Sequence, residues 1–511
     1  MVAHGGIDAL IWLCRSSTSK ELHHLITTIL AMLSEKESIR PVIITKWALP
    51  PLMQLIKFYT QPEFSKRVDK KSPVASIHSS ITAASSNSST IPPFESDGEG
   101  QQNVILEIVI NCTHVLYQLS RAGMFNQKET MSDGVLETLL MLATYELDMS
   151  MIEGMVSVEK AEGKPTADDT QYQEQLKERI SIVQSLAAKA ISAISASAPN
   201  QPSVIEQMQG TCKLAQMLRS QNEEVRKYIA KTVAYLSLRN DKYKSSLLSG
   251  DGARALVSII ACLPQADDGG DEEKRRSDLD YYLSSKENDV KSEEHTARLS
   301  QIGTQSETSL NAAAVSHTCC ALANFATNME SQLQLMSQPR LLKYICNIPA
   351  AFPTHTEIHR HVARCLANFA LYEENNSLML SDKQTNDNDH KDAYNVISTL
   401  LAMGQSANVT SDVQRQIVRA IDNLSSHAPT SNGASKWHSL FKDAYPYILR
   451  VLETSKDEDT VKRAESIRER ARLEEKEDMP SSTEDEEEVE ADTKPEKLQK
   501  KNRKKKGRNK N

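Results

Sequence analysis

His355 and His359 stand four residues apart, a spacing at which one face of a helix can present two imidazoles to a zinc ion. In zinc proteases of the His-Glu-x-x-His type, a glutamate follows the first histidine and acts as the general base. Here Thr356 fills that position, and Pro353 indicates that a helix starts nearby. The pair therefore favours a cluster at the start of a helix over a metal site, and we expect no metal.

Other patterns for catalysis are absent or incomplete in the sequence. Gly163-Lys164 lacks the first glycine of a phosphate-binding loop, because Val158 occupies its place. No Gly-x-Ser-x-Gly elbow occurs. The eight cysteines show no Cys-x-x-Cys spacing and lie mostly in apolar stretches, which is typical of buried thiols in a reducing compartment. We expect no catalytic residue, no cofactor and no enzymatic activity.

Basic residues recur at helical spacing between Lys189 and Arg419. Residues four apart lie on one helical face, and ammonium and guanidinium groups bind carboxylates and phosphates. Lysine and arginine are also common on any exposed helix, so the pattern alone leaves both interpretations open. The residues concerned are Lys189, the pair Lys227 and Lys231, the pair Arg360 and Arg364, and the pair Arg415 and Arg419.

These residues belong to a repeated pattern. Ala321-Leu322-Ala323-Asn324-Phe325-Ala326 matches the six residues that end at Ala370 and the six that end at Ser425, which contain Asn368 and Asn423. Weaker copies place Met32, Gln118, Ala193 and Tyr235 at the asparagine position. Tyr235 follows Ala193 by 42 residues, and Asn368 follows Asn324 by 44. The longer gaps approach this period once polar inserts at about 60–102, 147–174, 264–308 and 381–391 are removed.

A second recurring segment, often opened by glycine or aspartate, precedes each of these copies. Examples begin at Gly5, Gly134 and Asp251. Together the two segments resemble the armadillo family, the superfamily of β-catenin and importin-α, over roughly residues 1–477. The resemblance implies an all-α fold, a right-handed superhelical solenoid of about seven to eight repeats. The first copy begins in the middle of a repeat, so Gly5 onward either caps the array or continues a longer one.

The resemblance also implies where a ligand would bind. In armadillo proteins the longer helix of each repeat lines a concave groove, where the asparagine and the residue four before it face an extended peptide. Asn324, Asn368 and Asn423 take the first role. Lys189, Lys231, Arg364 and Arg419 take the second, and Lys227, Arg360 and Arg415 lie one turn further back. The importin-α tryptophan is absent, and the basic residues imply a groove that favours acidic over basic peptides. Cys320 and Ser316 interrupt the series in the repeat of Asn324.

The C-terminal residues 478–511 form an acidic block and then a basic block, both too highly charged to fold alone. The chain carries a formal net charge of −8, no run of 18 apolar residues and no recognisable signal peptide. We therefore expect a cytoplasmic protein, with a nuclear location as an alternative and no membrane span.

Two functions remain open at this stage. The first is a protein-binding adaptor whose groove takes extended acidic or phosphorylated segments. The second is an RNA-associated, ribosome-associated or nuclear transport factor that acts through residues 494–511, which would contact nucleic acid or an anionic surface weakly.

Overall fold

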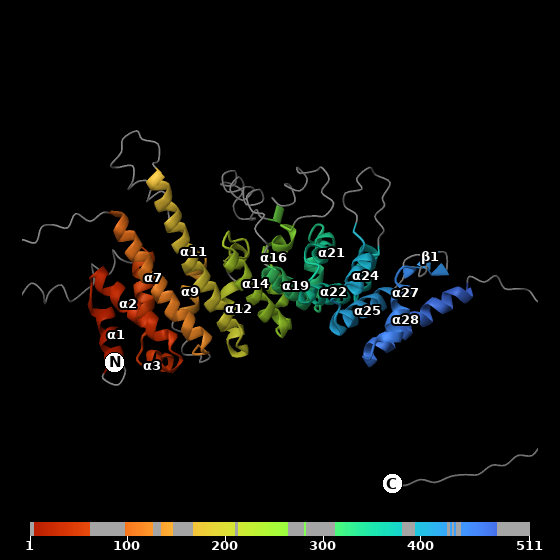
Figure 1. The fold of residues 1–511 in the computed structure, drawn as a ribbon, viewed down its shortest axis with the longest axis horizontal. Helices are drawn as coiled ribbons and strands as arrows, with labels where there is room; N and C mark the ends of the chain where they lie inside the picture. The colour runs from red at the N-terminus through yellow and green to blue at the C-terminus, as the bar shows by residue number, and fades with distance from the viewer. Residues whose placement is uncertain are drawn as a thin grey trace, which may run out of the picture.

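The computed structural model describes residues 5–61, 98–125, 134–146, 167–209, 213–263, 281–282, 312–380, 394–426, 430–431, 434–435 and 441–477. These residues are almost entirely helical, apart from the two-residue antiparallel strands β1 (Thr430–Ser431) and β2 (Ala434–Ser435). The helices form one elongated array with the N-terminal helices at one end and the C-terminal helices at the other (Figure 1). The predicted all-α solenoid is confirmed, while the predicted tail 478–511 lies outside the described residues.

Long helices form the continuous spine of the array. Each packs on the long helix before it and on the one after it, in chain order. The seven sequence copies lie on the first seven of these helices, in one register, and an eighth long helix follows them. The long helices are α2 (Lys20–Glu35), α7 (Gly98–Arg121), α11 (Ala167–Ser195), α14 (Glu223–Leu238), α19 (Ala312–Phe325), α22 (Thr356–Phe369), α25 (Ser411–Ser426) and α28 (Glu458–Glu477).

A second helix precedes each long helix. Gly5 and Gly134 lead into two of these helices with φ of 70° and 79°, a left-handed conformation that glycine adopts without steric cost. Arg340 occupies the equivalent position before α21 with φ of 55°, so the same left-handed turn forms there without glycine. The second helices are α1 (Gly6–Ser16), α4 (Leu49–Thr60), α9 (Val135–Ala143), α13 (Lys213–Leu218), α16 (Gly252–Ala261), α21 (Leu341–Ala351), α24 (Val396–Gln405) and α27 (Tyr445–Thr454).

A shorter first helix completes several repeats by linking one long helix to the next second helix. Two of these links also contain a 3₁₀ turn, η2 (Glu37–Ile39) and η3 (Ala198–Asn200). The described first helices are α3 (Arg40–Thr45), α12 (Gln201–Gln209), α15 (Asp241–Leu248), α20 (Met329–Met336) and α23 (Glu373–Met379).

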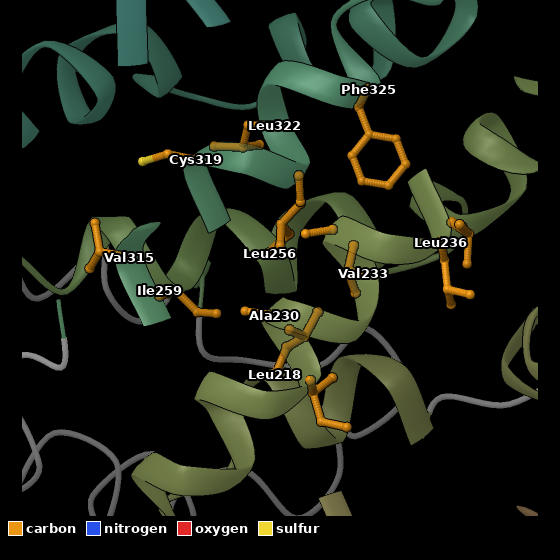
Figure 2. Close-up of a cluster of buried hydrophobic side chains, with 14 of the residues drawn as sticks. Leu218, Ala230, Val233, Leu236, Leu256, Ile259, Val315, Cys319, Leu322 and Phe325 are labelled. Carbon is orange, nitrogen blue, oxygen red and sulfur yellow. The ribbon is translucent and has the colours of Figure 1, made fainter. Parts of the chain in front are cut away.

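One hydrophobic core runs through the array, because each repeat buries its apolar face against its neighbours. Figure 2 shows this core where α13, α14, α16 and α19 meet, with Val233, Leu256 and Leu322 directed into the same space. Each of these three side chains is at most 2% exposed. Truncating a buried leucine such as Leu256 to alanine would cost about 2–5 kcal/mol of stability.

The structure corrects the limits of three predicted inserts. Helix α7 begins at Gly98 and α11 at Ala167, so the stretches predicted as inserts 60–102 and 147–174 contain the first turns of long helices. Tyr282, inside the predicted insert 264–308, is 1% exposed and its hydroxyl donates to the carbonyl of Pro339. The buried aromatic ring of Tyr282 supplies apolar surface, which the polar sequence of this predicted insert otherwise lacks. The remainder of these inserts, and 381–391, lies outside the described residues.

No single helix among the described residues is long and apolar enough to cross a membrane. The helical segments 171–195 and 198–208 meet the length and composition requirements only as a pair, across a bend of 104°.

Candidate functional site

The predicted asparagines connect consecutive repeats. Asn368 Nδ2 donates to the carbonyl oxygen of Ala323 at 2.7 Å, and Asn423 Nδ2 donates to that of Ala367 at 2.9 Å. Asn324 Nδ2 likewise donates to the carbonyl oxygen of Ala234 at 3.1 Å. Each asparagine therefore reaches back to the same position of the preceding long helix, one residue before the asparagine position of that helix.

Two of these bonds satisfy a carbonyl at the end of a helix. The last carbonyls of an α-helix have no intrahelical partner. Helix α19 ends at Phe325, and the next two amides, of Ala326 and Thr327, donate to Leu322 and Asn324 and bypass Ala323. Asn368 supplies the missing donor from the next repeat. The asparagine thus caps the long helix that precedes its own.

The arginines four residues before the asparagines point in the same direction. Arg364 Nη2 donates to Asn324 Oδ1 at 2.5 Å and to the carbonyl oxygen of Cys320 at 3.1 Å. Arg419 Nη2 donates to Asn368 Oδ1 at 2.9 Å. We call the two pairs Arg364–Asn324 and Arg419–Asn368 the interlock. In this structure the amides of Asn324 and Asn368 have both their donor and their acceptor engaged within the solenoid.

The basic residues one turn further back are paired with acids on their own helices. Arg360 Nη2 lies 2.6 Å from Glu357 Oε2, and Lys227 Nζ lies 2.7 Å from Glu224 Oε1. Arg415 pairs with Asp412 in the same way. Each acid stands eleven residues before the asparagine position of its helix, and Glu224, Glu357 and Asp412 all lie in a first helical turn, where the helix dipole favours negative charge.

Sequence reasoning missed these three acids, although their spacing would have revealed them. Two of the basic residues that they neutralise remain partly accessible, since the side chains of Arg360 and Arg415 are 34% and 41% exposed. Ion pairs this accessible contribute little stability and can exchange partners. The side chains are therefore available to another anion.

Lys189, Lys227 and Lys231, here called the lysine cluster, surround one aromatic ring. Their Nζ atoms lie 5.5, 5.0 and 6.0 Å from the ring centroid of Tyr228. Lys189 comes from α11 and the other two lysines from α14, so the cluster bridges two repeats. Lys189 Nζ also lies 3.1 Å from Glu224 Oε2.

The predicted residues thus fall into two groups on successive long helices. The lysine cluster lies on α11 and α14, while Arg360, Arg364, Arg415 and Arg419, here called the arginine group, lie on α22 and α25. Helix α19 separates the two groups, and there Ser316 and Cys320 occupy the corresponding positions.

Each group lies beside a histidine that stays neutral. Burial, and then the charges of Lys231 and Lys227, lower the pKa of His317 to about 4. Burial, and then Arg360 and Arg364, lower the pKa of His361 to about 4. Both imidazoles are at least partly buried beside cations, and each of these conditions disfavours a further positive charge.

The pair of histidines considered as zinc ligands occupies the start of α22. His355 directly precedes the helix, and His359 Nε2 lies 3.0 Å from the carbonyl oxygen of Phe352. In the part of the chain that the structure describes, no three His, Cys, Asp or Glu side chains are grouped to hold a metal ion.

The last long helix is held by a contact that the sequence did not predict. Asp422 on α25 is 9% exposed and pairs with Arg463 at 3.0 Å and with Arg470, both on α28. Arg470 also donates to the carbonyl oxygen of Asp422 at 3.0 Å. This aspartate directly precedes the asparagine position, so α28 is attached at the place where the interlock joins earlier repeats.

The unit that repeats along the chain is a short helix, a second helix and a long helix, in register with the armadillo motif. The fold is an armadillo-type α-solenoid. No protein-family model matches the chain, and no curated protein matches it.

Solved structures resemble the fold at low sequence identity. A chain from "A conserved phosphorylation switch controls the interaction between cadherin and beta-catenin in vitro and in vivo" is 12% identical, with 92% of this chain and 78% of that chain covered and a TM-score of 0.41. The designed armadillo repeat protein YIII(Dq)4CqI is 16% identical, with 56% and 93% covered and a TM-score of 0.38. A related design in complex with the peptide (KR)4 is also 16% identical, with 56% and 92% covered and a TM-score of 0.37.

Proposed function

We propose that this protein is a non-enzymatic adaptor whose long helices bind extended acidic or phosphorylated protein segments. The observation that carries the proposal is the charge on the predicted face. The lysine cluster and the arginine group contribute seven basic side chains, whereas the paired acids Glu224, Glu357 and Asp412 contribute three carboxylates. The excess favours an anionic ligand.

The shape of that ligand follows from the repeat. Successive long helices carry the basic residues at equivalent positions, so the charges are spread along the solenoid and not gathered at one point. An extended segment could meet several of them in turn, whereas a small anion would meet one group. A reducing compartment such as the cytoplasm suits the buried thiols of Cys112, Cys319 and Cys365.

The interlock divides the basic residues by role. Arg364 and Arg419 brace the asparagines of the preceding repeat, so reversing their charge would disturb the packing of the solenoid as well as any ligand. Arg415 pairs with Asp412 and Arg360 with Glu357, each on its own helix, and Arg360 Nη2 also lies 3.5 Å from His361 Nε2. They are therefore the better positions for a test of binding.

The test compares two double variants by fluorescence anisotropy with a labelled 15-residue peptide rich in Asp and Glu. Arg360→Glu with Arg415→Glu should weaken binding at least tenfold, because attraction is replaced by repulsion at two points. The matched control is Lys57→Glu with Lys242→Glu, which changes the net charge equally on α4 and α15.

The control variant changes positions away from the long helices, on the second helix α4 and the first helix α15. It should bind the acidic peptide within about twofold of the wild type. An amide version of the peptide, with Asn and Gln in place of the acids, should bind neither protein. Equal weakening in both double variants would show that net charge alone drives the binding and would remove the support for a specific face.

A further inference from the structure

The lysine cluster differs from the arginine group because its charged groups gather around one tyrosine ring. Three ammonium groups from two repeats converge on Tyr228, within 6.0 Å of its centroid. The side chains of Lys189 and Lys227 are 26% and 25% exposed, so the cluster is partly withdrawn from solvent. In such a setting the attraction for an anion is screened less than on an open surface.

The charges in the cluster do not balance. Glu224 is shared by Lys189 and Lys227, at 3.1 and 2.7 Å. Within the described part of the chain, no carboxylate pairs with Lys231, which lies over the rings of Tyr228 and Tyr235. His317 is neutral near pH 7, because burial and the two nearer lysines lower its pKa to about 4. Among the groups in direct contact, three ammonium groups and one carboxylate leave an excess of two positive charges. The charge of Glu223 acts on Lys227 without forming an ion pair with it.

We propose that the lysine cluster is a subsite for a phosphorylated side chain on the bound protein segment, and that Glu224 is an internal anion that the phosphate replaces. This inference rests on the proposed function and specifies the ligand at one point of the same face. A phosphomonoester carries about −1.5 to −2 charge at pH 7, which matches the excess.

The geometry of the donors favours phosphate over carboxylate. A phosphomonoester presents three strong acceptor oxygens, one for each ammonium group, whereas a carboxylate presents two. Lysine binds phosphate as a point charge and does not need the planar fork of arginine. Glu224, which is fixed on α14, pairs with Lys189 and Lys227 and does not pair with Lys231. The arginine group, by contrast, suits the acidic residues around the phosphate.

The inference is tested with three labelled 12-residue peptides that differ at one position, which is phosphoserine, Asp or Ser in an otherwise neutral sequence. Anisotropy titrations of the full chain should show the phosphoserine peptide binding at least tenfold more tightly than the Asp peptide. The Ser peptide should bind more weakly than either. Equal affinity of the phosphoserine and Asp peptides would overturn the inference.

Variants on both helices locate the site. Lys231→Gln on α14 and Lys189→Gln on α11 should each weaken the phosphoserine peptide about tenfold and the Asp peptide less than threefold. Glu224→Gln should strengthen the phosphoserine peptide several-fold, because the internal competitor is gone. Lys242→Gln is the control and should change nothing. Far-ultraviolet dichroism confirms that each variant is folded.

The remaining outcomes separate the two proposals. If inorganic phosphate competes as well as the phosphoserine peptide at equal concentration, the site binds small anions and the inference is wrong. If no phosphoserine preference exists but the Asp- and Glu-rich peptide still depends on Arg360 and Arg415, only the phosphate subsite fails. If neither kind of peptide binds, the proposed function fails with it.

Discussion

Replacing Asn368 with alanine should destabilise the centre of the solenoid by more than an ordinary surface change would. Asn368 is 2% exposed, donates to Ala323 at 2.7 Å and accepts from Arg419 at 2.9 Å. The variant loses both bonds. It also leaves the carbonyl of Ala323 without a donor in a buried place, since the amides that follow it bond elsewhere.

The magnitude follows from those two effects. A typical intramolecular hydrogen bond contributes about 1 kcal/mol net, and a buried acceptor left without a partner costs about 1–3 kcal/mol. The guanidinium of Arg419 can turn to solvent, so the loss of its hydrogen bond to Asn368 adds little to the cost. We expect about 3 kcal/mol in total.

The assay must resolve local stability, because the stability of a solenoid is a sum over neighbouring repeats and unfolding need not be all-or-none. Native-state hydrogen exchange followed by mass spectrometry measures the opening free energy of each segment. Asn368→Ala should accelerate exchange in α19 and α22 and leave α7 and α11 unchanged.

Asn423→Ala is the matched control. Asn423 makes the equivalent bond to Ala367 at 2.9 Å, but it is only partly buried, and among the described residues no arginine donates to its Oδ1. We expect a smaller loss of about 2 kcal/mol there, because the buried carbonyl of Ala367 also loses its donor but no arginine bond is lost. If Asn368→Ala costs less than Asn423→Ala, the interlock does not stabilise the array in the way argued.

Three further predictions concern packing and charge. Asp422→Ala should release α28 from α25 and cost about 2 kcal/mol of stability, because Arg463 and Arg470 lose a buried partner but are themselves partly exposed. Hydrogen exchange that becomes faster in α28 first would confirm this prediction, and uniformly faster exchange would contradict it. Gly404→Ala should cost about 1–3 kcal/mol in thermal unfolding, because an added Cβ would lie 2.6 Å from Tyr447 Cε2 in a packed interior; an unchanged melting temperature would show that Tyr447 moves aside freely. Affinity for the phosphoserine peptide should fall several-fold from pH 7.5 to 5.5, because the phosphate gains a proton near pH 6. His317, with a pKa of about 4, stays neutral over this range and adds no compensating charge. A rise in affinity instead would show that a histidine becomes protonated in this range.

The fold was largely predictable because one short motif marks the same turn of the first seven long helices. Asn324, Asn368 and Asn423 fixed the register, and the weaker copies at Met32 and Gln118 followed it onto α2 and α7. The sequence does not predict the starts of α7 and α11, because polar, glycine-containing stretches there favour an insert. Helical packing against neighbours extends those helices into residues that have little apolar content of their own.

The candidate site was predictable in position but not in the direction of its side chains. Arg364 and Arg360 differ by one helical turn, yet one braces a residue 40 positions earlier and the other pairs with Glu357. Sequence spacing shows which residues share one face of a helix. It does not show which residue of the neighbouring repeat each of them contacts. The role of Asn368 as a cap for α19 depends on where that helix ends, which the motif alone does not specify.

The most direct test of the central claim is to locate a bound acidic segment on the protein. A phosphorylated, Asp- and Glu-rich peptide with a photoreactive residue at each end is cross-linked to the full chain, and the attachment sites are mapped by mass spectrometry. We expect attachments on the long helices α14, α22 and α25, spread over more than one repeat, and their loss in the Arg360→Glu, Arg415→Glu variant. Attachments confined to the first and second helices, such as α15, α16 and α20, would contradict it.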